Sequence, residues 1–253
     1  MKTLLTLITF ALLALSANAA DTATELAAKL STAQQDGSSM VRLKMEARGV
    51  TLQLQIKQRR SANATEVVYQ ILWPKERLGE SVLLKKIGNQ AATGTLFVHP
   101  ATVRQLDMKD ALFGSDVSYA DVLENFFAWP NHAIVGTEVV NRVSCQILES
   151  KPGKSQRSNY AVVRTWVDTK RLVPLRIEKY NAAGQVTRLI DSGRIVTDDI
   201  GRHVPTGLTV TNPTKGSSTE LDGSKLKHDV TFTKDEFTPE GLQQMKLQQG
   251  KAE

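Results

Sequence analysis

Apolar and polar residues alternate along most of the chain from residue 40 onward, which is the pattern of a strand with one buried face. Three consecutive runs show the alternation most clearly: Met40–Arg48, Val50–Lys57 and Glu66–Trp73. Gly49 lies between the first two, where a tight turn or bulge needs a residue with backbone freedom. We expect the three runs to form an antiparallel meander with one dry and one wet face.

Further strands are expected at regular spacing after this meander. They are Ser81–Lys86, Thr93–His99, Ile134–Asn141, Arg142–Glu149, Tyr160–Asp168, Leu175–Asn181, Val186–Val196, Gly207–Asn212 and Leu226–Thr233. Turn signals separate several of them, for example Lys151-Pro152-Gly153 and Asp222-Gly223. About a dozen short strands in sequence, without a fixed repeat, predict one large curved sheet in a single domain.

Helical patterns are few. Thr22–Gln35 carries Leu26 and Leu30 on one stripe, and Ser118–Phe127 begins with a variant of the capping box, in which Ser118 is the N-cap and Asp121 follows three residues later. A last helix begins at Pro239 with Thr238 as its cap. We therefore expect a mainly β fold, an incomplete (half-open) antiparallel β-barrel with helices covering its concave face.

Residues 1–19 have the features of a signal peptide. Lys2 is followed by the apolar run Leu4–Leu15 and by Ala17-Asn18-Ala19, a small-x-small cleavage pattern. The apolar run is too short to cross a bilayer, and a retained N-terminal anchor is the alternative. We expect cleavage near Ala19-Ala20, export of the mature chain and one domain over residues 20–253.

Charge and cysteine content narrow the possible partners. The formal net charge is +6, but the basic residues are scattered and the densest group is Lys57-Gln58-Arg59-Arg60. A nucleic-acid site needs a denser stripe, so we expect a solvated face, with weak contact to an anionic membrane surface as the alternative. Cys145 is the only cysteine, which excludes an intramolecular disulfide. It alternates with Val143 and Ile147 on one strand face, as a buried, inert thiol would.

The residues that carry catalysis or bind metals are not arranged in any familiar motif. The four histidines, His99, His132, His203 and His228, lack the spacing of metal ligands. The pair Asp198-Asp199 could serve as an acid and a base, but its place at a strand end favours a solvated turn. We expect no catalytic residue, no metal and no cofactor, and therefore a protein that is not an enzyme.

Long apolar side chains on the dry face are the remaining candidates for function. Pockets of this character bind hydrophobic ligands, and each buried CH₂ group of an acyl chain contributes about 0.8 kcal/mol. The alternative for each residue is ordinary core packing. The residues expected to line a lipid-binding cavity are Leu43, Met45, Leu52, Leu54, Ile56, Tyr69, Ile71, Trp73, Phe97 and Trp129.

Several segments carry a resemblance to a known group of proteins. They are Gly114–Phe126 (GSDVSYADVLENF), Ile134–Cys145, Thr165–Tyr180, His203-Val204-Pro205 and Phe237-Thr238-Pro239. These stretches resemble periplasmic outer-membrane lipoprotein-sorting-like proteins of the LolA/LolB type. The resemblance implies an incomplete antiparallel barrel with a helical lid, and binding of acyl chains or lipidated proteins in its concavity. It implies no catalytic residues.

Three functions follow from these observations. The first is a periplasmic carrier for lipids or lipid-modified proteins in outer-membrane biogenesis, with an inner-membrane transporter supplying direction. The second is an envelope-stress regulatory module of the same fold that binds a protein partner. The third, an enzyme acting on envelope polymers, needs a polar cleft with paired carboxylates, which the sequence does not offer.

Overall fold

The computed structural model describes residues 22–34, 37–88, 90–154 and 156–244. They form two compact units: unit 1 contains residues 22–33 and 125–188, and unit 2 contains residues from 34 to 124 and from 189 onward. The expected signal peptide lies outside the described residues. Within the described ranges, no helix is both long and apolar enough to cross a membrane.

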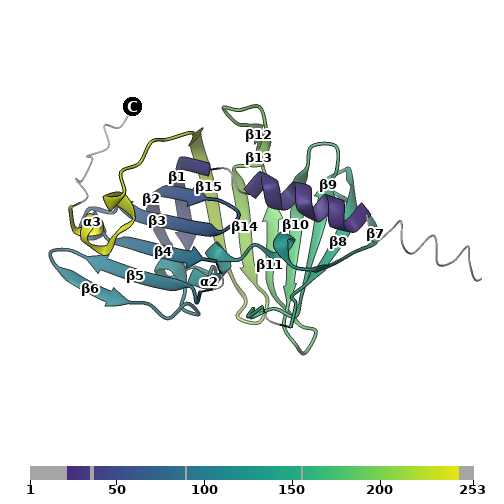
Figure 1. Cartoon of the computed structure of the whole chain (residues 1–253), viewed down its shortest axis with the longest axis horizontal. Helices are drawn as coiled ribbons and strands as arrows, with labels where there is room; N and C mark the ends of the chain where they lie inside the picture. The colour runs from purple at the N-terminus through teal and green to yellow at the C-terminus, as the bar shows by residue number, and fades with distance from the viewer. Residues whose placement is uncertain (1–21, 35–36, 89, 155, 245–253) are drawn as a thin grey trace, which may run out of the picture. The chain divides into compact units, whose positions relative to one another are not determined.

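The fold is mainly β. Its strands build a large antiparallel sheet that is not closed into a barrel, and helical segments are few (Figure 1). The fold class expected from the alternating pattern is confirmed. The boundary between the two units falls inside strand β11 (Val186–Ser192), after Arg188.

Unit 2 holds most of the sheet, in the strand order β6-β5-β4-β3-β2-β1-β15-β14-β11. The bounds are β1 Gly37–Ala47, β2 Val50–Arg60, β3 Ala64–Trp73, β4 Ser81–Ile87, β5 Thr93–Val98, β6 Thr102–Gln105, β14 Gly207–Asn212 and β15 Ser217–His228. A hairpin of β12 (Ile195–Thr197) and β13 (His203–Pro205) pairs separately. The short helical segments are η1 Lys75–Arg77, η2 Leu112–Gly114, α2 Tyr119–Leu123, η4 Asp235–Phe237 and α3 Pro239–Gln244.

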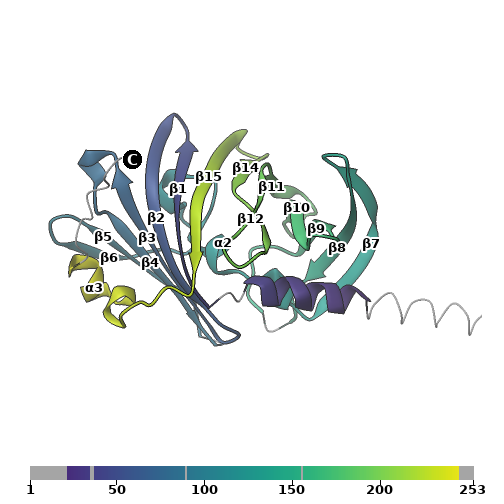
Figure 2. The same cartoon turned by 90° about the horizontal axis from the view of Figure 1, so that it is seen from above.

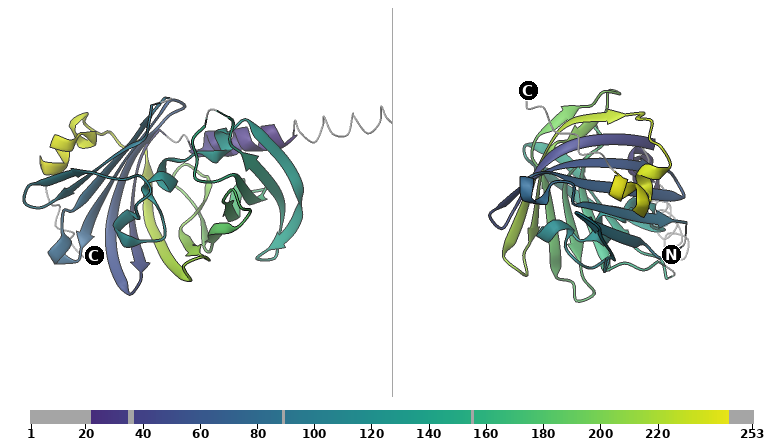
Figure 3. Two further views of the ribbon diagram at one scale, coloured as in Figure 1. Left: turned by 90° about the horizontal axis from the view of Figure 1, so that it is seen from below. Right: turned by 90° about the vertical axis from the view of Figure 1, so that its left-hand side faces the viewer.

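The predicted meander is present as β1, β2 and β3. Leu54 lies opposite Leu43 of β1 and Ile71 of β3, so the alternating apolar positions share one face. On the other face, α3 and η4 pack over β3, β4 and β5 (Figures 2 and 3). As expected, Thr238 caps α3, because its Oγ1 accepts the N–H of Gly241 at 2.9 Å.

Unit 1 is a smaller antiparallel sheet in the order β10-β9-β8-β7. Its strands are β7 Asn131–Val140, β8 Val143–Lys151, β9 Val162–Asp168 and β10 Val173–Tyr180, and η3 spans Phe126–Ala128. A helix covers residues 22–34 and lies across these strands (Figure 1). Cys145 in β8 is 1% exposed, and burial raises the pKa of its thiol, as expected for an inert cysteine.

The helix expected over Ser118–Phe127 is shorter than predicted. The capping box is confirmed: Ser118 Oγ accepts the N–H of Asp121 at 3.2 Å, and Asp121 Oδ2 accepts the N–H of Ser118 at 3.0 Å. However, α2 ends at Leu123, because Glu124 is extended. The apolar residues that follow Glu124 and those that precede it pack in two different clusters. One continuous helix cannot place its side chains in both clusters.

Three expectations after residue 185, one turn and two strands, are wrong. Asp222-Gly223 is not a turn but lies inside β15, which ends at His228, so no strand spans Leu226–Thr233. Gly223 approaches a neighbouring backbone closely: its N–H donates to the carbonyl of Thr206 at 2.6 Å, an approach that glycine permits. The run expected over Val186–Val196 divides into β11 and β12, with Gly193 between them.

Candidate functional site

Seven of the ten expected lipid-binding residues share one side of β1, β2 and β3, which we call the apolar face: Leu43, Met45, Leu52, Leu54, Ile56, Tyr69 and Ile71. Met45, Leu52, Leu54 and Ile71 form a cluster in which each side chain is at most 1% exposed. Burial raises the pKa of the Tyr69 phenol to about 12.

The apolar face is covered within unit 2 by residues 106–123, which we call the covering segment. Leu112, Tyr119 and Leu123 of this segment pack against Ile56 and its neighbours on β3, β4 and β5. Leu106, Met108, Phe113 and Val122 add partly buried contacts. In this structure the apolar face therefore contacts the protein's own side chains.

A buried polar contact fastens the covering segment to the sheet. Asp116 is 3% exposed, and its carboxylate accepts hydrogen bonds from Ser217 Oγ at 2.5 Å and from Thr219 Oγ1 at 3.0 Å. The N–H of Asp116 donates to the same Thr219 oxygen at 2.8 Å. In the sequence, Asp116 stands out only as part of the stretch Gly114–Phe126. Gly114, two residues before it, has a φ of +84°, and a glycine at this place was the available sign of a sharp turn.

Trp73 does not lie on the apolar face. A β-bulge in β3 places Ile71 opposite Leu54 but Trp73 opposite Gln53, so the alternation breaks at Leu72 and the side chain changes face. Trp73 is 48% exposed as a result. Strict alternation predicted the wrong side, because a bulge leaves no clear signal in sequence.

Phe97 and Trp129 are also separated from the apolar face. Phe97 lies opposite Ser81 and packs with Val68, Leu83, Phe237 and Leu242 on the other side of the sheet. Trp129 belongs to the core of unit 1 beside Phe126. The structure therefore brings together seven of the ten candidates.

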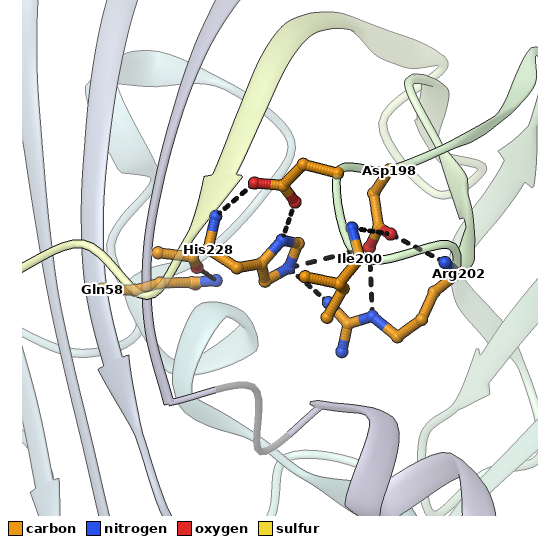
Figure 4. Close-up of polar contacts among 7 residues, drawn as sticks. Gln58, Asp198, Ile200, Arg202 and His228 are labelled. Carbon is orange, nitrogen blue, oxygen red and sulfur yellow. Dashed lines mark hydrogen bonds and ion pairs between the residues drawn. The ribbon is translucent and has the colours of Figure 1, made fainter.

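A second, polar group gathers at the end of β15. Figure 4 shows Asp198 and Arg202 of the β12–β13 hairpin turned toward His228. The Asp198 side chain is fully buried, which contradicts the expected solvated turn. It accepts the N–H groups of Ile200 at 3.1 Å and Arg202 at 2.7 Å, and Arg202 Nε at 3.0 Å. The partners of Asp198 within the hairpin are near it in sequence, whereas His228 is far away. No local sequence pattern predicts the contact with His228.

These contacts set the charge state of the two carboxylates. Burial alone would raise the pKa of Asp198, but the hydrogen bonds from Arg202 and Ile200 outweigh it, and the pKa is lowered. The hydrogen bond from the imidazole of His228 lowers the pKa of Asp199. Nδ1 of His228 faces Asp199, and Nε2 faces the guanidinium of Arg202, so the ring contacts both the carboxylate and the cation.

Asp198, Asp199 and His228 offer one ligand atom each within 4.8 Å of one another. The guanidinium of Arg202 donates to both Asp198 and His228, so a positive group already lies where a cation would need these atoms. The donor set does not fit a metal ion. Its role is to hold the hairpin against β15.

The basic run of β2 is not a free solvated face. Lys57 pairs with Glu236 at 2.6 Å, and Arg59 pairs with Glu66 at 2.6 Å while its guanidinium lies 4.1 Å from the centre of the Phe237 ring. These contacts hold the C-terminal segment on the sheet. A shallow polar depression of about 440 Å³ lies beside Arg59 and Ser38, away from the apolar face.

Solved structures with the same fold come from several bacteria. A DUF1329 family protein from Desulfovibrio piger has a TM-score of 0.80 at 20% identity, over 89% of this chain and 99% of that one. A putative outer membrane lipoprotein-sorting protein domain from Vibrio parahaemolyticus has a TM-score of 0.76 at 19% identity, over 88% and 99%. A LolA superfamily protein from Nitrosomonas europaea has a TM-score of 0.64 at 19% identity, over 87% and 97%.

No curated protein sequence matches this chain. A family model with the description "-like: Uncharacterized protein" matches residues 99–244, which is more than half of the chain. That range includes the covering segment from its start to its end, as well as β7 to β15. The chain belongs to this family, and it shares its fold with the DUF1329 family protein, the lipoprotein-sorting protein domain and the LolA superfamily protein named above.

Proposed function

We propose that this chain is a periplasmic carrier that binds lipids or lipid-modified proteins and shields their acyl chains on the apolar face of unit 2. In this proposal residues 1–19 are a cleaved signal peptide, residues 20–253 act as one domain, and no catalytic step is involved. The carrier would take part in lipoprotein sorting and outer-membrane biogenesis. An inner-membrane transporter, as a partner, would supply the direction that a passive carrier lacks.

The apolar face is the observation that carries the proposal. Seven long apolar or aromatic side chains converge there from three neighbouring strands, and an irregular segment covers them in place of a second sheet. An acyl chain of about 15 methylene groups gains about 12 kcal/mol on burial. That gain is larger than the cost of displacing a few apolar side chains of the covering segment, at about 2 kcal/mol each, so such a ligand can replace them.

The fold supports the same proposal. The protein from Vibrio parahaemolyticus is described as a putative outer membrane lipoprotein-sorting protein domain, and the match covers 88% of this chain and 99% of that one. Transferring that role to this chain is an inference from fold, because one fold can serve several functions. The apolar face supplies the physical argument that fold alone does not.

A pair of matched substitutions tests the proposal. Leu54 on the apolar face and Leu83 on the opposite face are 1% and 2% exposed, so Leu54→Gln and Leu83→Gln remove similar packing. Binding of a fluorescent fatty-acid probe is titrated for both variants, with circular dichroism as the check on folding. Leu54→Gln is expected to weaken binding about tenfold or more, since a buried amide opposes an acyl chain, and Leu83→Gln to leave it unchanged.

Two results would overturn this assignment. Equal weakening by both variants would mean that the probe reports stability and that the apolar face is ordinary core. Failure of the unmodified protein to bind any acyl probe would remove the carrier role. The remaining function would then be the regulatory module that binds a protein partner.

A further inference from the structure

We propose that Phe113 is a built-in occupant of the acyl-binding face and that Asp116 is the latch that keeps it there. The choice of an acyl chain as the ligand rests on the proposed carrier function, whereas the role of Asp116 as a latch does not depend on it. The covering segment would then be a gate with a closed state, seen in the structure, and an open state in which an acyl chain replaces the Phe113 ring.

Phe113 occupies the position that a ligand would take. Its ring packs against the cluster of Met45, Leu52, Leu54 and Ile71 and also against the cluster around Ile56. It is the one residue of the covering segment that contacts both clusters among the described residues. The guanidinium of Arg77 lies 5.6 Å from the centre of the ring, so the ring is held from its outer side as well.

The backbone at Phe113 is strained. Its φ is +50° and that of Gly114 is +84°. Glycine adopts such values freely, but a bulky residue does not. A residue held in this region persists only when surrounding contacts impose it, and such residues gather at ligand clamps and switches. The surrounding contacts here are the packing of the Phe113 ring and the hydrogen bonds of Asp116, three residues further along.

The latch joins parts of the chain that are far apart in sequence. Asp116 is 101 positions from Ser217 and 103 from Thr219. Three hydrogen bonds meet at this one residue, and both hydroxyl groups donate to a carboxylate. Bonds to a charged group are stronger than neutral ones. The two hydroxyl groups share the Asp116 carboxylate, and the third bond comes from the backbone N–H of the same residue.

The covering segment is also built to move as one piece. Its own hydrogen bonds run from Ala120 N–H to the Met108 carbonyl and from Leu112 N–H to the Val117 carbonyl, each at 2.8 Å. The capping box of Ser118 and Asp121 is internal too. At its start, Leu106 N–H donates to the Gly94 carbonyl of β5 at 2.9 Å. Losing the Asp116 contacts would remove the polar attachment of the middle of the segment, while its internal hydrogen bonds, its start and the apolar packing of Leu112 and Tyr119 remain.

Hydrogen–deuterium exchange of the ligand-free protein tests the latch. Asp116→Asn keeps the size of the side chain but removes the charge that Ser217 and Thr219 contact. We expect the amides of residues 108–123 to exchange about ten- to a hundredfold faster, the change that matches loss of charge-assisted hydrogen bonds. The control is Ser218→Ala, at an exposed position between Ser217 and Thr219, which should change nothing. Unchanged exchange, or faster exchange over all of unit 2, would overturn the latch.

A second arm tests the occupant. Phe113→Ala empties the site, and we expect the fatty-acid probe to bind about tenfold more tightly, because it no longer competes with the ring. The matched control is Phe232→Ala, a partly buried phenylalanine on the opposite face, with no expected change in affinity. Weaker or unchanged binding by Phe113→Ala would contradict the proposal. If the unmodified protein binds no probe, the carrier function fails, while the exchange experiment still decides the latch.

Discussion

The two units cover their apolar clusters in different ways. In unit 1 the cover is the regular helix of residues 22–34, whose Ala23, Leu26, Ala27 and Leu30 are all at most 8% exposed. Their spacing is that of one stripe of an amphipathic helix. In unit 2 the cover is an irregular segment in which the only α-helix, α2, has five residues. It also carries a buried carboxylate and a residue of positive φ.

The proposed roles of the two covers follow this difference. In unit 1 a regular helix with small and medium apolar side chains buries its face continuously. In unit 2 the covering segment packs Leu112, Tyr119 and Leu123 on the sheet and adds a buried polar attachment around Asp116. We therefore propose that ligand exchange takes place in unit 2, while unit 1 serves structural stability.

The largest expected effect comes from emptying the core of unit 1. Phe127 is 2% exposed and packs beside Phe126, so Phe127→Ala should lower the free energy of unfolding by about 3–5 kcal/mol. Denaturant titration followed by circular dichroism measures this loss. Probe affinity per folded molecule should stay the same. A loss of affinity with unchanged stability would reverse the roles assigned to the two units.

A smaller effect is expected at the polar group that holds the β12–β13 hairpin. Asp198→Asn weakens the contacts to Arg202 and should cost about 1–3 kcal/mol at neutral pH. Because the pKa of Asp198 is lowered in the folded protein, its carboxylate stabilises the fold above its unfolded pKa of about 4. That stability is lost as the pH falls through the folded pKa.

The pH dependence of stability tests the explanation given for Asp198→Asn. Unfolding free energies of the two proteins, measured by denaturant titration from pH 7 downward, should converge below about pH 4. The covering segment should exchange its amides equally fast in both. A difference between the proteins that persists undiminished in acid would show that Asp198 acts by packing and not by charge.

The smallest effect is expected at the cap of α2. Ser118→Ala removes the acceptor of the Asp121 N–H and should cost about 1 kcal/mol. Unlike Asp116→Asn, it acts inside the covering segment, so it should loosen residues 119–123 without releasing Phe113. Hydrogen–deuterium exchange, measured for each peptide of the covering segment, distinguishes the effect of Ser118→Ala from that of Asp116→Asn. Identical patterns would mean that Asp116 has no special place in the closure.

The alternating runs after residue 40 were sufficient to predict the meander and its dry face. Val41, Leu43 and Met45 face Ile56, Leu54 and Leu52 as a period of two requires. The helix caps Ser118 and Thr238 could also be predicted from the sequence, because capping depends on neighbours within three residues. The strand alternation and the helix caps depend on residues that are close together in the sequence, so the sequence alone could predict them.

The failures were all nonlocal. Trp73 changed sides through a bulge that only the pairing of β2 and β3 reveals. Asp222-Gly223 has the composition of a turn, yet β1 holds it within a strand. Asp198 has the setting of an exposed turn, yet its side chain is buried and faces Arg202 and the distant His228. In each case a partner far away in sequence outweighed local preference.

Native mass spectrometry of the protein purified gently from a periplasmic extract tests the carrier assignment most directly. The account predicts a stoichiometric lipid or acylated peptide that co-purifies with the unmodified protein, and lower occupancy in Leu54→Gln than in Leu83→Gln. An empty protein that also takes up no fatty-acid probe would contradict it.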